Sequence, residues 1–164
     1  IGTGNHFAEF QCLEHVYREE EAERLGLLEG RIMLLVHSGS RGYGQEILNR
    51  FYSPEGLPED GEEGSRYLAE HDSAILWAGR NRMVTAKKLL AYLGVESEVN
   101  PLLESCHNYL ERTEEGWLHR KGSVSTKRGA VVIPGSRGSL SYVCVPAADT
   151  AVSLDSVSHG AGRK

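Results

Sequence analysis

The chain has 164 residues, of which 40% are hydrophobic and 25% are charged, and its formal net charge is −5 at pH 7. This length is enough for one domain with a substantial core, so we expect a single domain over residues 1–164. The composition is ordinary for a soluble globular protein, no apolar run approaches the roughly 20 residues of a membrane helix, and no signal-peptide pattern is present.

The charge is unevenly distributed along the chain. Residues 1–111 contain 10 Lys and Arg against 19 Asp and Glu, whereas residues 112–164 contain 8 against 4. A polyanion is therefore expected on the C-terminal third, although a solvated surface of varying charge explains the same pattern. The cysteines are odd in number and lack CxxC spacing, which indicates a reduced, cytoplasmic protein: Cys12, Cys106 and Cys144.

The N-terminal part is expected to alternate between strands and helices. A glycine-rich loop followed by a strand with one polar-tolerant face is predicted over residues 1–14. The apolar run of residues 31–36 predicts a buried strand that ends at His37. The other elements expected here are a short exposed helix over 14–29, a helix over 44–52 and a loop over 53–64.

The longest predicted element is a helix over residues 65–93, which Gly94 would end. Apolar side chains recur along it at helical spacing and are expected to form a core stripe: Leu76, Met83, Ala86, Leu90 and Leu93. Strand-like segments follow over residues 105–110, 116–123, 129–133 and 140–145. Together these segments predict an α+β fold, with mixed sheet layers and the long helix packed alongside.

Three histidines occupy positions that favour a metal site. His6 begins a strand, His37 ends one, and His107 is expected inside a third. Imidazoles brought together from separate strands commonly bind a divalent metal, although a single histidine is more often a buried structural residue. The other histidines lie in charged stretches and are expected to be solvated or at the surface: His15, His71 and His119.

Glycine-rich loops surround several of these positions. Residues 37–42 (HSGSRG) expose backbone N–H groups that suit phosphate, and residues 158–163 (SHGAGR) present His159 in a loop that can approach a ligand closely. Residues 134–142 could supply hydroxyls and amides to a nucleotide, although a tight hairpin is the simpler interpretation. The cysteines are not expected among the metal ligands, and Cys144 is expected in the core.

Taken together, these motifs resemble the RtcB family of RNA-splicing ligases. They occur in the family's order and span nearly the whole chain: GTGNHFAEFQ (2–11), HSGSRG (37–42), HNYLE (107–111), RKG (120–122), PGSRGSLSY (134–142) and SHGAGR (158–163). The resemblance implies an enzyme of RNA repair or tRNA splicing. Such an enzyme joins a 2′,3′-cyclic phosphate or 3′-phosphate RNA end to a 5′-hydroxyl end, using GTP and Mn²⁺.

The resemblance also implies roles for individual residues. His159 matches the nucleophile that forms a covalent histidine–GMP, and Arg41 is expected to meet RNA phosphate. Three residues match ligands of manganese, of which two ions are expected in the complete enzyme: His6, His37 and His107. The positions around the guanine nucleotide are matched by Asn5, His6, Phe7, Ala8, Glu9, His107, Asn108, Pro134, Gly135, Ser136, Arg137, Ser141, His159, Gly160, Ala161 and Gly162.

Several family features are not found in this sequence. The family places a metal-binding Asp and Cys before the first motif and a guanine-contacting lysine near its C-terminus. We therefore expect a fragment that has weak or no activity by itself. Two other classes fit the same motifs. One is a metal-dependent hydrolase or cyclic phosphodiesterase that never forms a GMP adduct, and the other is a non-catalytic nucleotide- or RNA-binding remnant.

Overall fold

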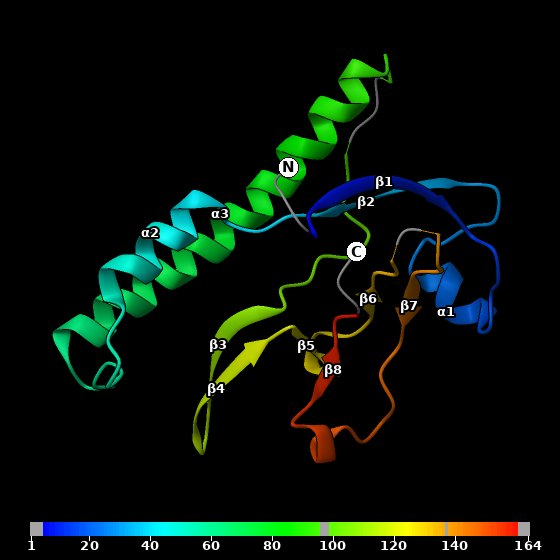
Figure 1. Ribbon diagram of the computed structural model, residues 1–164. Coiled ribbons are helices and arrows are strands. Elements are labelled where there is room, and N and C mark those ends of the chain that lie inside the picture. The colour runs from blue at the N-terminus through cyan, green and yellow to red at the C-terminus, as the bar shows by residue number, and fades with distance from the viewer. Residues whose placement is uncertain (1–4, 96–98, 137, 161–164) are drawn as a thin grey trace. The chain divides into compact units, whose positions relative to one another are not determined.

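The computed structural model describes residues 5–95, 99–136 and 138–160 (Figure 1). The chain divides into two compact units, and each is described by itself. Unit 1 contains Ile1–Glu9 and Leu34–Val99, and unit 2 contains Phe10–Met33 and Asn100–Lys164. Helices and small sheets are both present, which confirms the predicted α+β class. In the part of the chain that the structure describes, no helix is both long and apolar enough to cross a membrane.

The first two strands pair with each other. β1 (Phe7–Cys12) and β2 (Ile32–His37) form a two-stranded sheet, and β2 ends at His37 as predicted. The strand is not buried as expected, because Ile32 is exposed and its other residues are half-buried. The helix between them, α1 (Glu19–Arg24), is shorter than the predicted segment 14–29. Its first turn holds three glutamates, which interact favourably with the partial positive charge of a helix N-terminus.

Two helices pack side by side in unit 1 (Figure 1). They are α2 (Gly42–Phe51) and α3 (Glu62–Tyr92). The ring centroids of Tyr43 and Trp77 are 6.3 Å apart, and those of Phe51 and Tyr67 are 5.6 Å apart. Because residues later in α2 contact residues earlier in α3, the two helices run antiparallel. The long helix and its neighbour were both predicted, and α3 begins three residues before the predicted segment 65–93.

The predicted apolar stripe on the long helix is only partly a core face: Ala86 is buried and Met83 and Leu90 are half-buried, but the other two members are exposed. Leu76 is 67% exposed and Leu93 is 51% exposed. The buried positions of α3 are small residues: Gly64, Ala78 and Ala86. At Gly64, a Cβ atom would overlap the backbone carbonyl of Pro58. Small side chains let a neighbouring backbone approach closely, so burial on this helix follows residue size and not hydrophobicity alone.

Unit 2 contains antiparallel two-stranded sheets. β3 and β4 form a hairpin whose pairs run from Asn108↔Lys121 to Thr113↔Gly116. β5 pairs with β8, and β6 pairs with β7. The bounds are β3 Asn108–Thr113, β4 Gly116–Lys121, β5 Ser123–Ser125, β6 Val131–Ile133, β7 Tyr142–Cys144 and β8 Ser156–Ser158. Short 3-10 turns cover Thr126–Arg128 and Ala151–Ser153. Buried side chains of this unit include Tyr109, Val124 and Val131.

Several strand predictions need correction. The third strand begins at Asn108 and not at residue 105, so His107 precedes the strand instead of lying within it. Gly122, with a φ of +65°, divides the predicted strand 116–123 into β4 and β5. Cys144 is only half-buried, so it is not a core residue. The hairpin interpretation of residues 134–142 is confirmed in its topology, since this segment connects the paired strands β6 and β7, but the connection from Ile133 to Tyr142 is too long for a tight turn.

Candidate functional site

Unit 1 brings together two of the predicted metal-binding histidines. His6 directly precedes β1 and His37 ends β2, and their ring centroids are 6.0 Å apart. The Phe7 ring stacks on His37 at 5.3 Å with 8° between the planes, which holds the imidazole in one orientation. Each metal–nitrogen bond is about 2 Å long, so two imidazoles that share an ion lie on the order of 5–6 Å apart. The pair therefore fits one divalent metal ion.

The loop that follows His37 is held by α3. Asn81 donates from Nδ2 to Ser38 Oγ at 3.1 Å and to the Gly39 carbonyl at 3.2 Å. Arg82 donates from Nη1 to the Ser38 carbonyl at 2.9 Å. Ser38 is only 5% exposed, so these bonds are shielded from water. The helix thus fixes the backbone directly after a candidate metal ligand.

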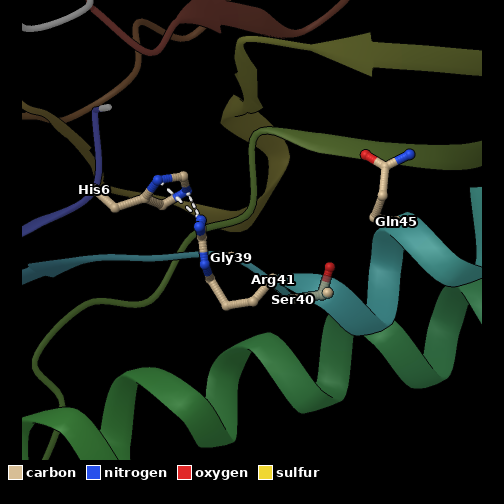
Figure 2. A pocket seen from close by; sticks show the side chains of 6 residues that line it. His6, Gly39, Ser40, Arg41 and Gln45 are labelled. Carbon is tan, nitrogen blue, oxygen red and sulfur yellow. Dashed lines mark hydrogen bonds between the residues drawn. The ribbon is translucent and has the colours of Figure 1, made fainter. Parts of the chain in front are cut away.

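The guanidinium of Arg41 lies against the His6 ring (Figure 2). Arg41 Nη1 is 2.9 Å from Nδ1 and 2.6 Å from Nε2 of His6, and it donates to the ring. The φ of Arg41 is +56°, an uncommon value for a residue with a side chain. It lines an open pocket of about 420 Å³ together with His6, Gly39, Ser40, Gly42 and Gln45. A guanidinium next to the N-terminus of α2 suits an anionic phosphate.

Unit 2 brings His107 and His159 together. Their ring centroids are 3.8 Å apart and the planes are tilted by 30°. The His159 N–H donates to the Gly122 carbonyl at 3.0 Å, and the Ser123 N–H donates to the His107 carbonyl at 3.1 Å. Burial and then the neighbouring His107 lower the pKa of His159 from its ordinary 6.5 to about 4. The imidazole of His159 is therefore neutral at pH 7, the form that acts as a nucleophile.

Two glycine-containing loops of unit 2 meet at Gly160 and Pro134. Gly160 has a φ of +115°, and a Cβ atom there would lie 2.7 Å from the Pro134 carbonyl oxygen. In the second loop, Ser141 Oγ accepts from the Gly135 N–H at 3.1 Å and from Gln11 Nε2 at 2.9 Å. With both lone pairs used in this way, the Ser141 hydroxyl can offer its proton to a ligand.

The other residues predicted around the nucleotide have varied surroundings. Asn108 Oδ1 accepts from the Gly122 N–H at 2.8 Å, which gives this side chain a structural role at the corner between β4 and β5. Asn5 is exposed, and Ser136 Oγ shares a hydrogen bond with Ser139 Oγ at 3.1 Å. The remaining members on β1 are half-buried: Phe7, Ala8 and Glu9. Three predicted positions lie outside the described residues: Arg137, Ala161 and Gly162.

The histidines predicted at the surface behave differently from one another. His15 and His119 are exposed, as expected. The prediction for His71 was wrong, because its side chain is only 13% exposed. On a helix, residues four apart share a face, and the His71 ring lies 6.1 Å from that of Tyr67. Although His71 Nδ1 lies 3.0 Å from the exposed carboxylate of its neighbour Asp72, most of the ring is covered, so local composition gave a misleading indication.

Three residues behind the site were not singled out from the sequence. They are Gln11, which holds Ser141, Asn81, which holds the loop after His37, and Arg120, which is 4% exposed in unit 2. Arg120 belongs to the RKG motif, so a signal was present. Each of the three makes at least one hydrogen bond to a residue 34 or more positions away, which no local pattern reveals.

Comparisons with known proteins agree over the whole chain. The family model described as tRNA-splicing ligase RtcB matches residues 1–164. The RNA-splicing ligase RtcB2 of Escherichia coli is 42% identical over 171 residues, which cover 100% of this chain and 44% of that protein. The tRNA-splicing ligase RtcB of Thermococcus kodakarensis is 30% identical, and the match covers 99% of this chain and 44% of that protein. The tRNA-splicing ligase RtcB of Methanocaldococcus jannaschii is 29% identical, and the match covers 100% of this chain and 22% of that protein. The chain therefore spans less than half the length of these relatives.

Proposed function

Because this chain belongs to the RtcB family of tRNA-splicing ligases, we propose that it serves as part of an RNA ligase. The enzyme joins a 2′,3′-cyclic phosphate or 3′-phosphate RNA end to a 5′-hydroxyl end, with GTP as the energy source and Mn²⁺ as the metal. The observation that supports this most is the neutral, half-buried imidazole of His159, which stacks on His107 next to the Gly160 and Pro134 loops.

In the proposed first step, a ring nitrogen of His159 attacks the α-phosphorus of GTP. A P–N bond forms while the bond from the α-phosphorus to the bridging oxygen breaks, and pyrophosphate leaves with that electron pair. A lowered pKa supports this role, since the lone pair is available at pH 7 without a base to remove a proton. A 2′,3′-cyclic phosphate is first opened by water to a 3′-phosphate. An oxygen of this 3′-phosphate attacks the phosphorus of the adduct, and the P–N bond breaks with its electron pair returning to His159. The 5′-hydroxyl oxygen then attacks the activated 3′-phosphorus and loses its proton, while GMP leaves.

We propose that His6, His37 and His107 are the manganese ligands of this chain. The spacing of His6 and His37 and the imidazole donor set support this assignment. A bound divalent ion supplies charge neutralisation on the crowded phosphates. Arg41 is proposed to contact RNA phosphate, and its place in an open pocket beside α2 is consistent with that role. The three free thiols support a cytoplasmic setting.

Intact-mass measurement after incubation with GTP and Mn²⁺ tests the proposal. It is run on this chain and on the longest form of the protein that its gene encodes. We expect a GMP adduct that acid removes, that is absent in His159→Ala and that is retained in His119→Ala, a matched variant at an exposed histidine. Normal labelling of His159→Ala would overturn the nucleophile assignment. If neither version is labelled, ligation is contradicted, and opening of a 2′,3′-cyclic phosphate without an adduct would instead indicate a phosphodiesterase.

A further inference from the structure

We infer that Arg120 is a positioning residue for His159: it holds the start of β8 and thereby sets where the imidazole that follows β8 lies. The inference rests on the proposed function of His159 as the nucleophile. Arg120 lies on β4, and its guanidinium bonds to Glu111, Ser156 and Leu154, so it acts on the imidazole through the backbone between them.

The guanidinium of Arg120 is held firmly inside unit 2. Its side chain is 1% exposed. Arg120 Nε and Nη2 both donate to Glu111 Oε2, at 2.9 and 2.7 Å. Its cross-strand partner Tyr109 places an aromatic ring 5.8 Å from the guanidinium carbon. A buried cation costs desolvation energy that only specific partners offset, so this side chain has one strongly preferred geometry.

The same guanidinium also reaches the segment that enters β8. Arg120 Nη1 donates to Ser156 Oγ, and Nη2 donates to the Leu154 carbonyl at 3.3 Å. Between these two acceptors the backbone is unusual. Leu154 and Asp155 have φ values of +53° and +49°, a left-handed conformation that residues with a side chain rarely adopt. Such a turn persists only where surrounding contacts stabilise it.

The same turn is also held from its other side. Asp155 Oδ1 accepts from Thr150 Oγ1 at 2.7 Å, and Lys127 Nζ lies 3.2 Å from its second carboxylate oxygen. These two contacts lower the pKa of the Asp155 carboxyl, which keeps it charged. The Thr126 N–H donates to the Asp155 carbonyl at 2.8 Å. Arg120 is the buried, charged component of this network, and it is the one that contacts β8 itself.

A short path connects this turn to the nucleophile. β8 has three residues and pairs with β5 from Ser156↔Ser125 to Ser158↔Ser123. The next residue, His159, donates its N–H to the Gly122 carbonyl, two residues after Arg120. Arg120 is therefore connected to both backbone segments that hold His159: it bonds to Ser156 at the start of β8, and it is two residues from Gly122. Three extended residues span about 10 Å, so a displacement at Ser156 reaches His159 with little to absorb it. A displacement of about 1 Å can cost a hundredfold in rate.

The first test replaces both charged partners together, in an R120M/E111L variant. No charge is then left buried alone, and such exchanges often preserve stability. We expect little change in the thermal midpoint but at least about tenfold faster hydrogen exchange at the His159 amide, a contact whose opening is local. The Leu93 amide, which donates to Leu89 in α3, should exchange as before. The matched control is R24M/E21L, which removes an exposed ion pair of 2.7 Å on α1.

The second readout is the rate of GMP-adduct formation. It is measured in whichever form of the protein becomes labelled with GMP when its sequence is wild type. We expect the maximal rate of R120M/E111L to fall about a hundredfold, with the GTP concentration at half-maximal rate unchanged. A general loss of folding would change both. Ser156→Ala replaces the double variant if the latter does not fold, because it removes one acceptor of Arg120 without disturbing the buried pair. We expect the same two changes at smaller size: faster exchange of the His159 amide and a lower maximal rate.

The outcomes separate the two claims. Unchanged His159 amide exchange in both variants would overturn the role of Arg120, whatever the enzyme does. Absence of any adduct in wild-type protein would overturn the proposed function, while the amide exchange would still decide whether Arg120 positions His159.

Discussion

At the scale of single residues, the candidate site contains imidazoles in two different surroundings. His6 accepts from the guanidinium of Arg41, so a cation lies beside a ring that we propose as a metal ligand. His159 is half-buried against the ring of His107, so protonation is disfavoured. The guanidinium of Arg41 would compete with the proposed metal ion for His6, and the neutral ring of His159 would favour the proposed nucleophilic attack. Both effects can be measured without turnover.

Removal of the Arg41 cation should strengthen metal binding in unit 1. Arg41→Met should raise the affinity for Mn²⁺ about tenfold, on the scale of one charge-assisted hydrogen bond, because the His6 lone pair no longer has to be released. Isothermal titration calorimetry without GTP would measure the change. His6→Ala and His37→Ala should weaken binding. An affinity of Arg41→Met that is equal to or below that of wild type would contradict the competition.

The lowered pKa of His159 predicts a pH dependence of stability in metal-free protein. The unfolded chain binds a proton at this residue near pH 6.5, whereas the folded chain binds it near pH 4. The unfolded state thus holds more protons in this window, and the free energy of unfolding should fall as the pH decreases from about 6.5 toward 4. NMR titration of the His159 ring in EDTA measures the pKa directly. A midpoint near 6.5, or a stability slope unchanged in His159→Ala, would be incompatible with this prediction.

At the scale of elements, helices and loops position side chains that they do not themselves carry. α3 holds the loop after His37 through Asn81 and Arg82. In unit 2, the loop containing Gly160 packs on the end of β6, where a Cβ atom at Gly160 would lie 3.2 Å from Ile133 Cγ2. Each contact is removed by one substitution outside the set of predicted metal ligands, so positioning can be tested separately from direct metal coordination.

Asn81→Leu keeps a similar side-chain volume but removes both hydrogen bonds from Nδ2 to Ser38 and Gly39. We expect a loss of about 1–3 kcal/mol of stability, because the buried Ser38 hydroxyl loses a partner. Mn²⁺ binding should also weaken, since His37 is adjacent. Urea unfolding and metal titration measure the two effects. Asn49→Leu is the control, at an exposed side chain that accepts from Gln45, and equal behaviour of the two variants would refute the role of α3.

Gly160→Ala should lower the stability more than an alanine substitution at a glycine where only backbone strain opposes the change. Its positive φ disfavours alanine, and the new methyl would meet the Pro134 carbonyl. Gly30→Ala is the matched control, because Gly30 has a φ of +75° with no atom within 4 Å of a Cβ. We expect a loss of about 1–2 kcal/mol for Gly30→Ala and a clearly larger loss for Gly160→Ala, measured by urea unfolding. Equal losses would show that the contact with Pro134 is unimportant.

At the scale of the whole molecule, local patterns predicted the elements whose stability is local. The helix around residues 65–93 and the strand that ends at His37 follow from periodicity and from an apolar run, and the structure confirms both. β8 was not predicted, because its three residues form a strand only through pairing with β5. The start of β3 was misplaced for a related reason: it is set by pairing with β4, not by the pattern around Cys106.

The candidate site divides in the same way. The motifs indicated His6, His37, His107 and His159, and the structure places these as two pairs, one in each unit. The sequence could not indicate the supporting contacts, such as the ion pair between Arg120 and Glu111. Such partners lie on different strands or helices, and only the folded chain determines their distances and burial.

The division into two compact units has an optical consequence. The chain has two tryptophans, and Trp77 on α3 belongs to unit 1 while Trp117 on β4 belongs to unit 2. Each ring has its own environment, with Tyr43 near Trp77 and the Arg112 guanidinium 5.3 Å from Trp117. Replacement of either tryptophan by phenylalanine leaves one fluorescent reporter in a known unit. Coincident urea curves would mean that residues 1–164 unfold as one cooperative domain, and separate curves would give each unit its own stability.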